Sequence, residues 1–96
     1  MDHIDTETAR ILRAGREAQD LLGSPTFVGV LNELSDLYLR EIIDTAPHES
    51  KTREDRYLRI QVLRDISTTL TNRVALAQRE QMNAEIATND PDIEET

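Results

Sequence analysis

Few residues of this chain have the types and spacing that chemistry requires. Its imidazoles are His3 and His48, which lie far apart in the sequence, and the neighbouring carboxylates of Glu54 and Asp55 would point about 100° apart on a helix. The chain has no cysteine, which excludes disulfides, zinc–thiolate sites and cysteine nucleophiles. It also lacks a phosphate-binding loop, a dinucleotide fingerprint and the HExxH and GxSxG motifs. We therefore predict no enzyme activity, no cofactor and no metal site, and we interpret His48 as an exposed loop residue.

A basic cluster is the most structured polar feature of the sequence. Its members are Lys51, Arg53, Arg56, Arg59 and Arg64. Three of these arginines recur at every third residue and so share one face of a helix. Because guanidinium groups pair bidentately with carboxylates and phosphates, the cluster can bind an acidic partner surface or a phosphate backbone. We favour the alternative, in which it pairs with Glu41 and Asp44 at the facing end of the preceding helix.

Three helices must position these groups. Glycines and prolines fall at breakpoints that divide the chain into helices over about 6–22, 25–45 and 53–87. With 38% hydrophobic residues, one Phe, two Tyr and no Trp, the composition suits helix packing better than a sheet sandwich. We therefore predict an all-α fold, an antiparallel helical hairpin with a long C-terminal helix plus an N-terminal helix.

The break between the first two helices has the clearest local signals. We expect Gly23 to take the left-handed conformation that ends many helices, and Ser24 to cap the second helix with Pro25 in its first turn. Gly29 interrupts the apolar face of that helix. A close helix crossing would explain it, although a simple loss of helix propensity would do so as well.

The other two helix starts carry weaker signals. Asp5 or Thr6 can cap the first helix, because a short side-chain oxygen accepts the unpaired N–H groups of the first turn. Thr52 followed by Asp55 resembles a capping box, although the usual partner is Glu or Gln. We predict that this pair opens the third helix.

Apolar residues at helical spacing define the surfaces that we expect to bind protein. The predicted interaction residues, which include three arginines of the basic cluster, are Phe27, Leu31, Leu34, Tyr38, Tyr57, Leu63, Leu70, Arg53, Arg56 and Arg59. A second set widens the helix faces beyond what one partner helix can cover and comprises Val28, Leu39, Ile43, Leu58, Val62 and Leu76. Since a chain of this size buries only a modest core, we predict a homo-oligomer or docking on a larger protein.

Charge narrows the possible partners. The 96 residues include 19 acidic and 11 basic side chains, for a formal net charge of −8, and the pI of about 4.6 argues against binding to nucleic acid or to an anionic membrane. No run approaches the roughly 20 apolar residues of a membrane span, and we see no signal peptide. We expect residues 1–87 to form a single helical domain and 88–96, with four acidic residues, a flexible acidic tail.

One long segment of the chain resembles a known group of proteins. The run AQDLLGSPTFVGVLNELSDLYLREIIDTAPHESKTREDRYLRIQVLRDISTTL combines a helix ending in two leucines, a short break, a helix closing in I-x-x-T-x-P and a polar loop with T-R-E-x-x-Y. This order resembles a group of short helical proteins of tailed bacteriophages that are encoded among the head and packaging genes. The resemblance covers about residues 9–82 and implies a role in the virion or in its assembly. It carries over no functional residues.

Two functional hypotheses follow. The first is a non-enzymatic phage structural or assembly protein that oligomerises or docks on a capsid, portal or other virion component, located in the virion or the host cytoplasm. The second is a small acidic inhibitor that mimics nucleic acid and blocks a host defence or DNA-binding enzyme. Because arginines are interspersed with the acidic residues through residues 10–73, we favour the first.

Overall fold

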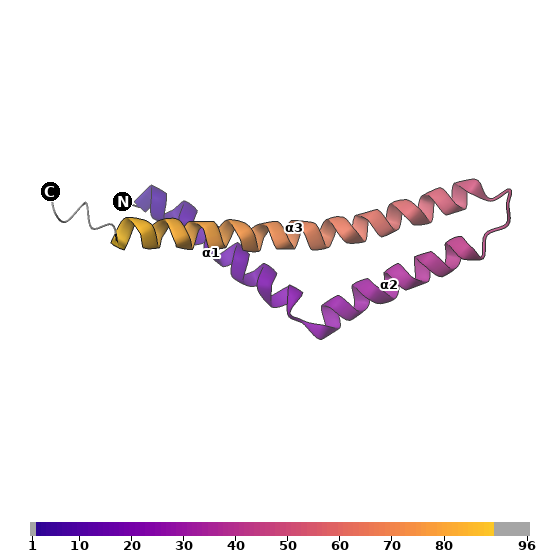
Figure 1. The fold of residues 1–96 in the computed structure, drawn as a ribbon, viewed down its shortest axis with the longest axis horizontal. Helices are drawn as coiled ribbons and strands as arrows, with labels where there is room; N and C mark the ends of the chain where they lie inside the picture. Colours follow the sequence, from indigo (N-terminus) through magenta and orange to yellow (C-terminus); the bar gives the residue numbers. More distant parts are fainter. Residues whose placement is uncertain (1, 90–96) are drawn as a thin grey trace. The chain divides into compact units, whose positions relative to one another are not determined.

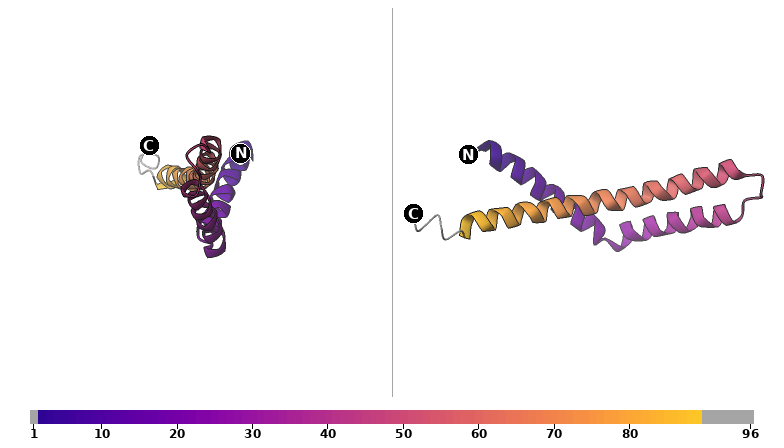
Figure 2. Two further views of the ribbon diagram at one scale, coloured as in Figure 1. Left: turned by 90° about the vertical axis from the view of Figure 1, so that its right-hand side faces the viewer. Right: turned by 45° about the horizontal axis from the view of Figure 1, so that its top comes forward.

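The computed structural model describes the backbone of residues 2–89 and the side chains of residues 6–86. Over this range the chain forms three α-helices and no strand, which confirms the all-α prediction: α1 (Asp2–Leu22), α2 (Pro25–Ile43) and α3 (Ser50–Asn89) (Figure 1). The chain divides into two compact units, one formed by α1 up to Gln19 together with α3 from Leu70 onward, the other by Asp20–Thr69. Helix α3 is continuous through both units (Figure 2).

Two of the predicted helix starts are wrong. Helix α1 begins at Asp2, so the expected caps Asp5 and Thr6 lie inside it. Helix α3 begins at Ser50 and runs to Asn89, so Thr52 lies within its first turn and does not cap it. The predicted acidic tail lies outside the described residues from residue 90 onward.

Helix α3 starts early because Glu49 organises the end of the preceding loop. The backbone N–H of Ala46 donates to Glu49 Oε1 at 2.6 Å, and the carbonyl oxygen of Glu49 accepts from the N–H of Arg53 at 3.2 Å. The first hydrogen bond closes a turn of the loop, and the second makes the carbonyl oxygen of Glu49 the first acceptor of the helix. The capping-box interpretation missed it because it searched for the cap inside the helix.

The break between α1 and α2 confirms one prediction and corrects another. Ser24 caps α2 in an extended conformation (φ −86°, ψ 115°), its Oγ accepts from the N–H of Phe27 at 3.2 Å, and Pro25 occupies the first turn. Gly23, however, has no positive φ, so the left-handed prediction is wrong. The N–H of Ser24 donates instead to the carbonyl oxygen of Leu21 at 3.0 Å, and this tight turn needs no left-handed residue.

A Ser24→Ala variant tests this cap. Losing the Oγ acceptor leaves the N–H of Phe27 without its partner, which should lower the free energy of unfolding by about 1 kcal/mol. Urea denaturation followed by circular dichroism measures the change. Ser24→Asp, which restores an acceptor at the same position, should unfold at nearly the wild-type midpoint. An unchanged midpoint in Ser24→Ala would show that the cap contributes nothing.

In the first unit, α1 crosses α3 at a glycine that the sequence reasoning overlooked. A Cβ atom built on Gly15 would lie 2.2 Å from the Cβ of Ala77 and 3.1 Å from the carbonyl oxygen of Arg73. Nearby, the Thr8 hydroxyl donates to Glu80 Oε1 at 3.4 Å. The close crossing expected at Gly29 is wrong, because a Cβ there would meet nothing within 4 Å. Of the two interpretations of Gly29, only the second remains, in which this glycine simply lowers the helix propensity of α2.

The described helices bury few side chains. Between residues 6 and 86, the buried hydrophobic residues are Ala18 and Leu70, 2% and 8% exposed, and both belong to the first unit. No residue of the second unit is buried. Over the same range twelve large hydrophobic residues are exposed: Leu21, Val30, Leu37, Leu39, Ile43, Tyr57, Leu58, Val62, Ile66, Leu76, Met82 and Ile86.

Candidate interaction surface

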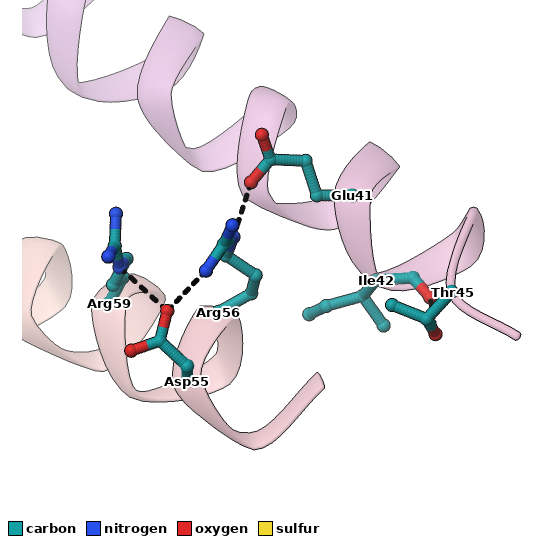
Figure 3. A network of polar contacts seen from close by, with 6 residues as sticks. All are labelled: Glu41, Ile42, Thr45, Asp55, Arg56 and Arg59. Atoms are coloured by element: carbon teal, nitrogen blue, oxygen red, sulfur yellow. Dashed lines mark hydrogen bonds and ion pairs between the residues drawn. The ribbon is translucent and has the colours of Figure 1, made fainter. Parts of the chain in front are cut away.

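The basic cluster lies in the second unit, where α2 and the start of α3 are joined by the loop of residues 44–49. Arg56 Nε donates to Glu41 Oε1 at 2.5 Å, which confirms the predicted pairing with Glu41, and Arg56 also pairs with Asp55 (Figure 3). Asp55 accepts a second ion pair from Arg59 at 2.9 Å. The guanidinium carbon of Arg59 lies 5.6 Å from the centre of the Tyr38 ring, within cation–π range.

The third arginine of the cluster closes the loop. Arg53 donates to the Thr45 hydroxyl at 3.0 Å and to the carbonyl oxygens of Ala46 at 2.8 Å and Pro47 at 3.2 Å. The Thr45 hydroxyl in turn donates to the carbonyl oxygen of Ile42 at 2.7 Å, at the end of α2 (Figure 3). Arg53 therefore donates to three oxygen atoms of the 44–49 loop and connects this loop to the first turns of α3.

The pairing predicted for Asp44 is wrong. Its backbone N–H instead donates to the carbonyl oxygen of Arg40 at 2.9 Å and so ends α2, and its carboxylate makes no ion pair with the described part of the chain. Lys51 and Arg64 likewise form no ion pair within residues 6–86. The three arginines with partners are thus used to hold the α2–α3 end together, which leaves little of the cluster for a phosphate backbone.

The pKa of Arg56 is raised above its ordinary value, first by the hydrogen bond to Glu41 and then by the one to Asp55. A basic group whose pKa is raised on folding contributes stability that is lost only as the pH rises through that raised pKa. Because an arginine is already charged throughout the normal working range of pH, the contribution of the Arg56 charge persists across it.

An Arg56→Ala variant is expected to lower the midpoint of thermal unfolding. The lost hydrogen bond with Glu41 joins α2 to α3, and the one with Asp55 lies within α3, whereas the control Arg64→Ala removes an exposed arginine without an ion pair in the described chain. The difference between the two variants should shrink at high salt, because these side chains are partly exposed. Equal midpoints for both variants at low salt would contradict the prediction.

The predicted apolar interaction residues are divided between covered and open positions. Five of them, Phe27, Leu31, Leu34, Tyr38 and Leu63, are half-buried, Tyr57 is exposed, and Leu70 is buried. Leu70 therefore contributes to packing within the chain and offers no free surface. The set expected to widen the helix faces is more open, since all its members except the half-buried Val28 are exposed.

An exposed apolar stripe follows α3 within the second unit. Leu58, Val62 and Ile66 are spaced by four residues, so they lie on one face of the helix, and all three are exposed. We call these three residues the α3 stripe. Leu58 and Val62 belong to the set of residues that were expected from the sequence to widen the helix faces.

Two open grooves lie elsewhere on the helices. The first, on α2, is lined by Val30, Glu33, Leu34, Asp36, Leu37 and Arg40. The second, on the C-terminal half of α3, is lined by Asn72, Ala75, Leu76 and Arg79. We call them the α2 groove and the α3 groove. Their charged residues were missed by the sequence reasoning, which looked for clusters of one charge and not for single charges beside exposed leucines.

Other kinds of site find no support in the described chain. No group of three or more His, Cys, Asp or Glu residues is arranged to hold a metal ion among the residues searched, and His48 is exposed. None of the helices within residues 2–89 combines the length and apolarity needed to cross a membrane. Comparison of the chain with known protein families, with curated proteins and with solved structures finds no match.

Proposed function

We propose that the chain is a non-enzymatic structural or assembly protein of a tailed bacteriophage, whose helices associate with copies of the chain and with a capsid, portal or other virion component. The observation that carries the proposal is the imbalance between buried and exposed apolar side chains. Among residues 6–86, two hydrophobic residues are buried and twelve large ones are exposed. The resemblance of residues 9–82 to proteins encoded among phage head and packaging genes supports the assignment to a virion or to its assembly.

The physical argument concerns the second unit above all. Most helical stability in proteins comes from packing an apolar face, because isolated helices in water are marginal. In Asp20–Thr69 no side chain is buried, yet exposed apolar residues lie on both α2 and α3. A leucine or isoleucine that passes from fully exposed to fully buried contributes about 1.5–3 kcal/mol, so a partner that covers one of these partly exposed side chains gains a fraction of that figure. Association therefore adds the burial that this unit lacks by itself.

The nucleic-acid mimic is less well supported by the arrangement of charges. Such a mimic needs free carboxylates in regular rows. Glu41 and Asp55 are instead paired with arginines of the chain, and Glu49 accepts from its own loop. The two carboxylates that remain on α2, those of Glu33 and Asp36, are too few to form such a row, and Arg40 lies one turn after Asp36.

Two measurements test the proposed function. Light scattering and sedimentation should show a species larger than a monomer at micromolar concentration, and mass spectrometry should detect the chain in purified particles or in assembly intermediates. A strictly monomeric chain that unfolds cooperatively, and that is absent from particles and intermediates, would overturn the proposal. Inhibition of a DNA-binding host enzyme on titration with the chain would favour the mimic instead.

A further inference from the structure

The α2 groove combines an apolar floor with acidic side chains. Val30 and Leu37 are 48% and 38% exposed, and Leu34 lies half-buried between them. Glu33 and Asp36 are both exposed and form no ion pair with the described residues. With two carboxylates against the guanidinium of Arg40, the groove has an acidic excess. A complementary surface must therefore offer an apolar side chain and a cation.

The α3 groove of the first unit offers both. Leu76 is 49% exposed, and Arg79, one turn further along, is exposed without an ion pair within residues 6–86. Asn72, one turn before Leu76, brings an amide, and Ala75 is small enough to let a helix approach. The groove has no acidic residue, so its excess charge is opposite to that of the α2 groove.

The spacing of the two grooves allows them to pair. Glu33 lies one turn before Leu37, whereas Arg79 lies one turn after Leu76. When the two helices run antiparallel with Leu37 against Leu76, Glu33 and Arg79 therefore fall at the same level. At the other end Arg40 faces Asn72, whose amide oxygen accepts from a guanidinium. The apolar contact, the ion pair and the amide contact occur in one register.

We propose that the α2 groove of one copy of the chain binds the α3 groove of a second copy, held by a Leu37–Leu76 contact and a Glu33–Arg79 ion pair. The inference rests on the proposed self-association and identifies the surfaces that form it. Because the two grooves are different surfaces of the same chain, the contact is heterologous. Repeating it builds a ring where the rotation closes and an open filament where it does not.

Charge reversal tests the pairing. Glu33→Arg and Arg79→Glu should each weaken self-association of the full chain by about tenfold, since each places like charges together at the contact. The double variant, which restores an opposite pair, should recover most of the wild-type association. Asp65→Arg and Arg13→Glu reverse exposed charges outside both grooves and serve as matched controls that should associate as the wild type does. Sedimentation velocity over a range of concentrations measures the wild-type chain and all five variants.

A mixing experiment shows whether the contact is head-to-tail. In an equimolar mixture of the Glu33→Arg and Arg79→Glu chains, the two unchanged grooves can pair, and the two reversed grooves carry opposite charges and can pair as well. The mixture should therefore assemble, although each variant alone stays mostly monomeric. Single variants that assemble like an oligomeric wild type, or a mixture of the two that stays monomeric, would overturn the inference while leaving the proposed function standing. A monomeric wild type also overturns the inference, and the presence of the chain in particles then decides the proposed function separately.

Discussion

A Gly15→Ala variant is expected to lose stability, whereas Gly29→Ala is expected to gain it. On helix propensity alone both changes are favourable by about 0.5–1 kcal/mol, because alanine loses less backbone entropy than glycine in a helix. At position 15, however, the added methyl would lie 2.2 Å from the Cβ of Ala77, so the two helices must move apart. Overpacking of this kind costs about 1–3 kcal/mol and should outweigh the gain.

Urea denaturation at one fixed protein concentration measures both effects, since association with other copies also changes apparent stability. Adding Ala77→Gly to the Gly15→Ala chain supplies the matched control. That second change removes the colliding Cβ but leaves the carbonyl oxygen of Arg73 at 3.1 Å, so stability should return only in part. If Gly15→Ala and Gly29→Ala shift the unfolding midpoint in the same direction, the crossing of α1 and α3 is not as close as described.

Polar substitution of the α3 stripe is expected to prevent the chain from docking on the proposed virion component without unfolding the chain. In a variant carrying Leu58→Gln, Val62→Thr and Ile66→Gln, three exposed side chains are replaced, so the free energy of unfolding should change by less than about 1 kcal/mol. A partner that covers these side chains loses their apolar contact, and co-purification with particles should fall by about tenfold or more. Quantitative mass spectrometry of particles assembled with each variant measures the loss.

Leu70→Ala is the contrasting control for the stripe. Leu70 lies on the same helix but is only 8% exposed, so shortening it opens a cavity and should cost about 2–5 kcal/mol in the free energy of unfolding. Because the stripe does not form part of either groove, the triple variant should still associate with other copies through them. A stripe variant that unfolds as readily as Leu70→Ala would show that the stripe is packed within the chain.

The accuracy of the sequence-based predictions depended on the range of the interactions involved. The cap formed by Ser24 involves an N–H three residues away and a neighbouring proline, so the local sequence contains all that is needed. The ion pair of Arg56 with Glu41 was predictable because a short loop brings the two helix ends together. Gly23 was assigned wrongly, since its conformation depends on how the next helix departs and not on its own type.

Contacts between segments far apart in the sequence were the hardest to predict from the sequence. Gly15 and Gly29 both interrupt a helical pattern, yet one lies against α3 and the other meets nothing. The sequence reasoning chose Gly29 because it sits on an apolar face, but an apolar face does not reveal which residue a distant helix approaches. Leu70 was similarly predicted to bind protein, whereas the structure buries it within the chain.

By itself, the sequence determined the three helices, the capped break at Ser24 and the presence of more apolar side chains than three helices can bury. Helical spacing and capping depend on neighbouring residues, so the sequence alone contains the information. Only the tertiary structure decided that α1 crosses α3 at Gly15, that Arg53 donates to the loop between α2 and α3, and that single opposite charges lie beside Leu37 and Leu76. Those features depend on which faces remain covered once helices pack. Contacts between distant segments, and not local spacing, set that outcome.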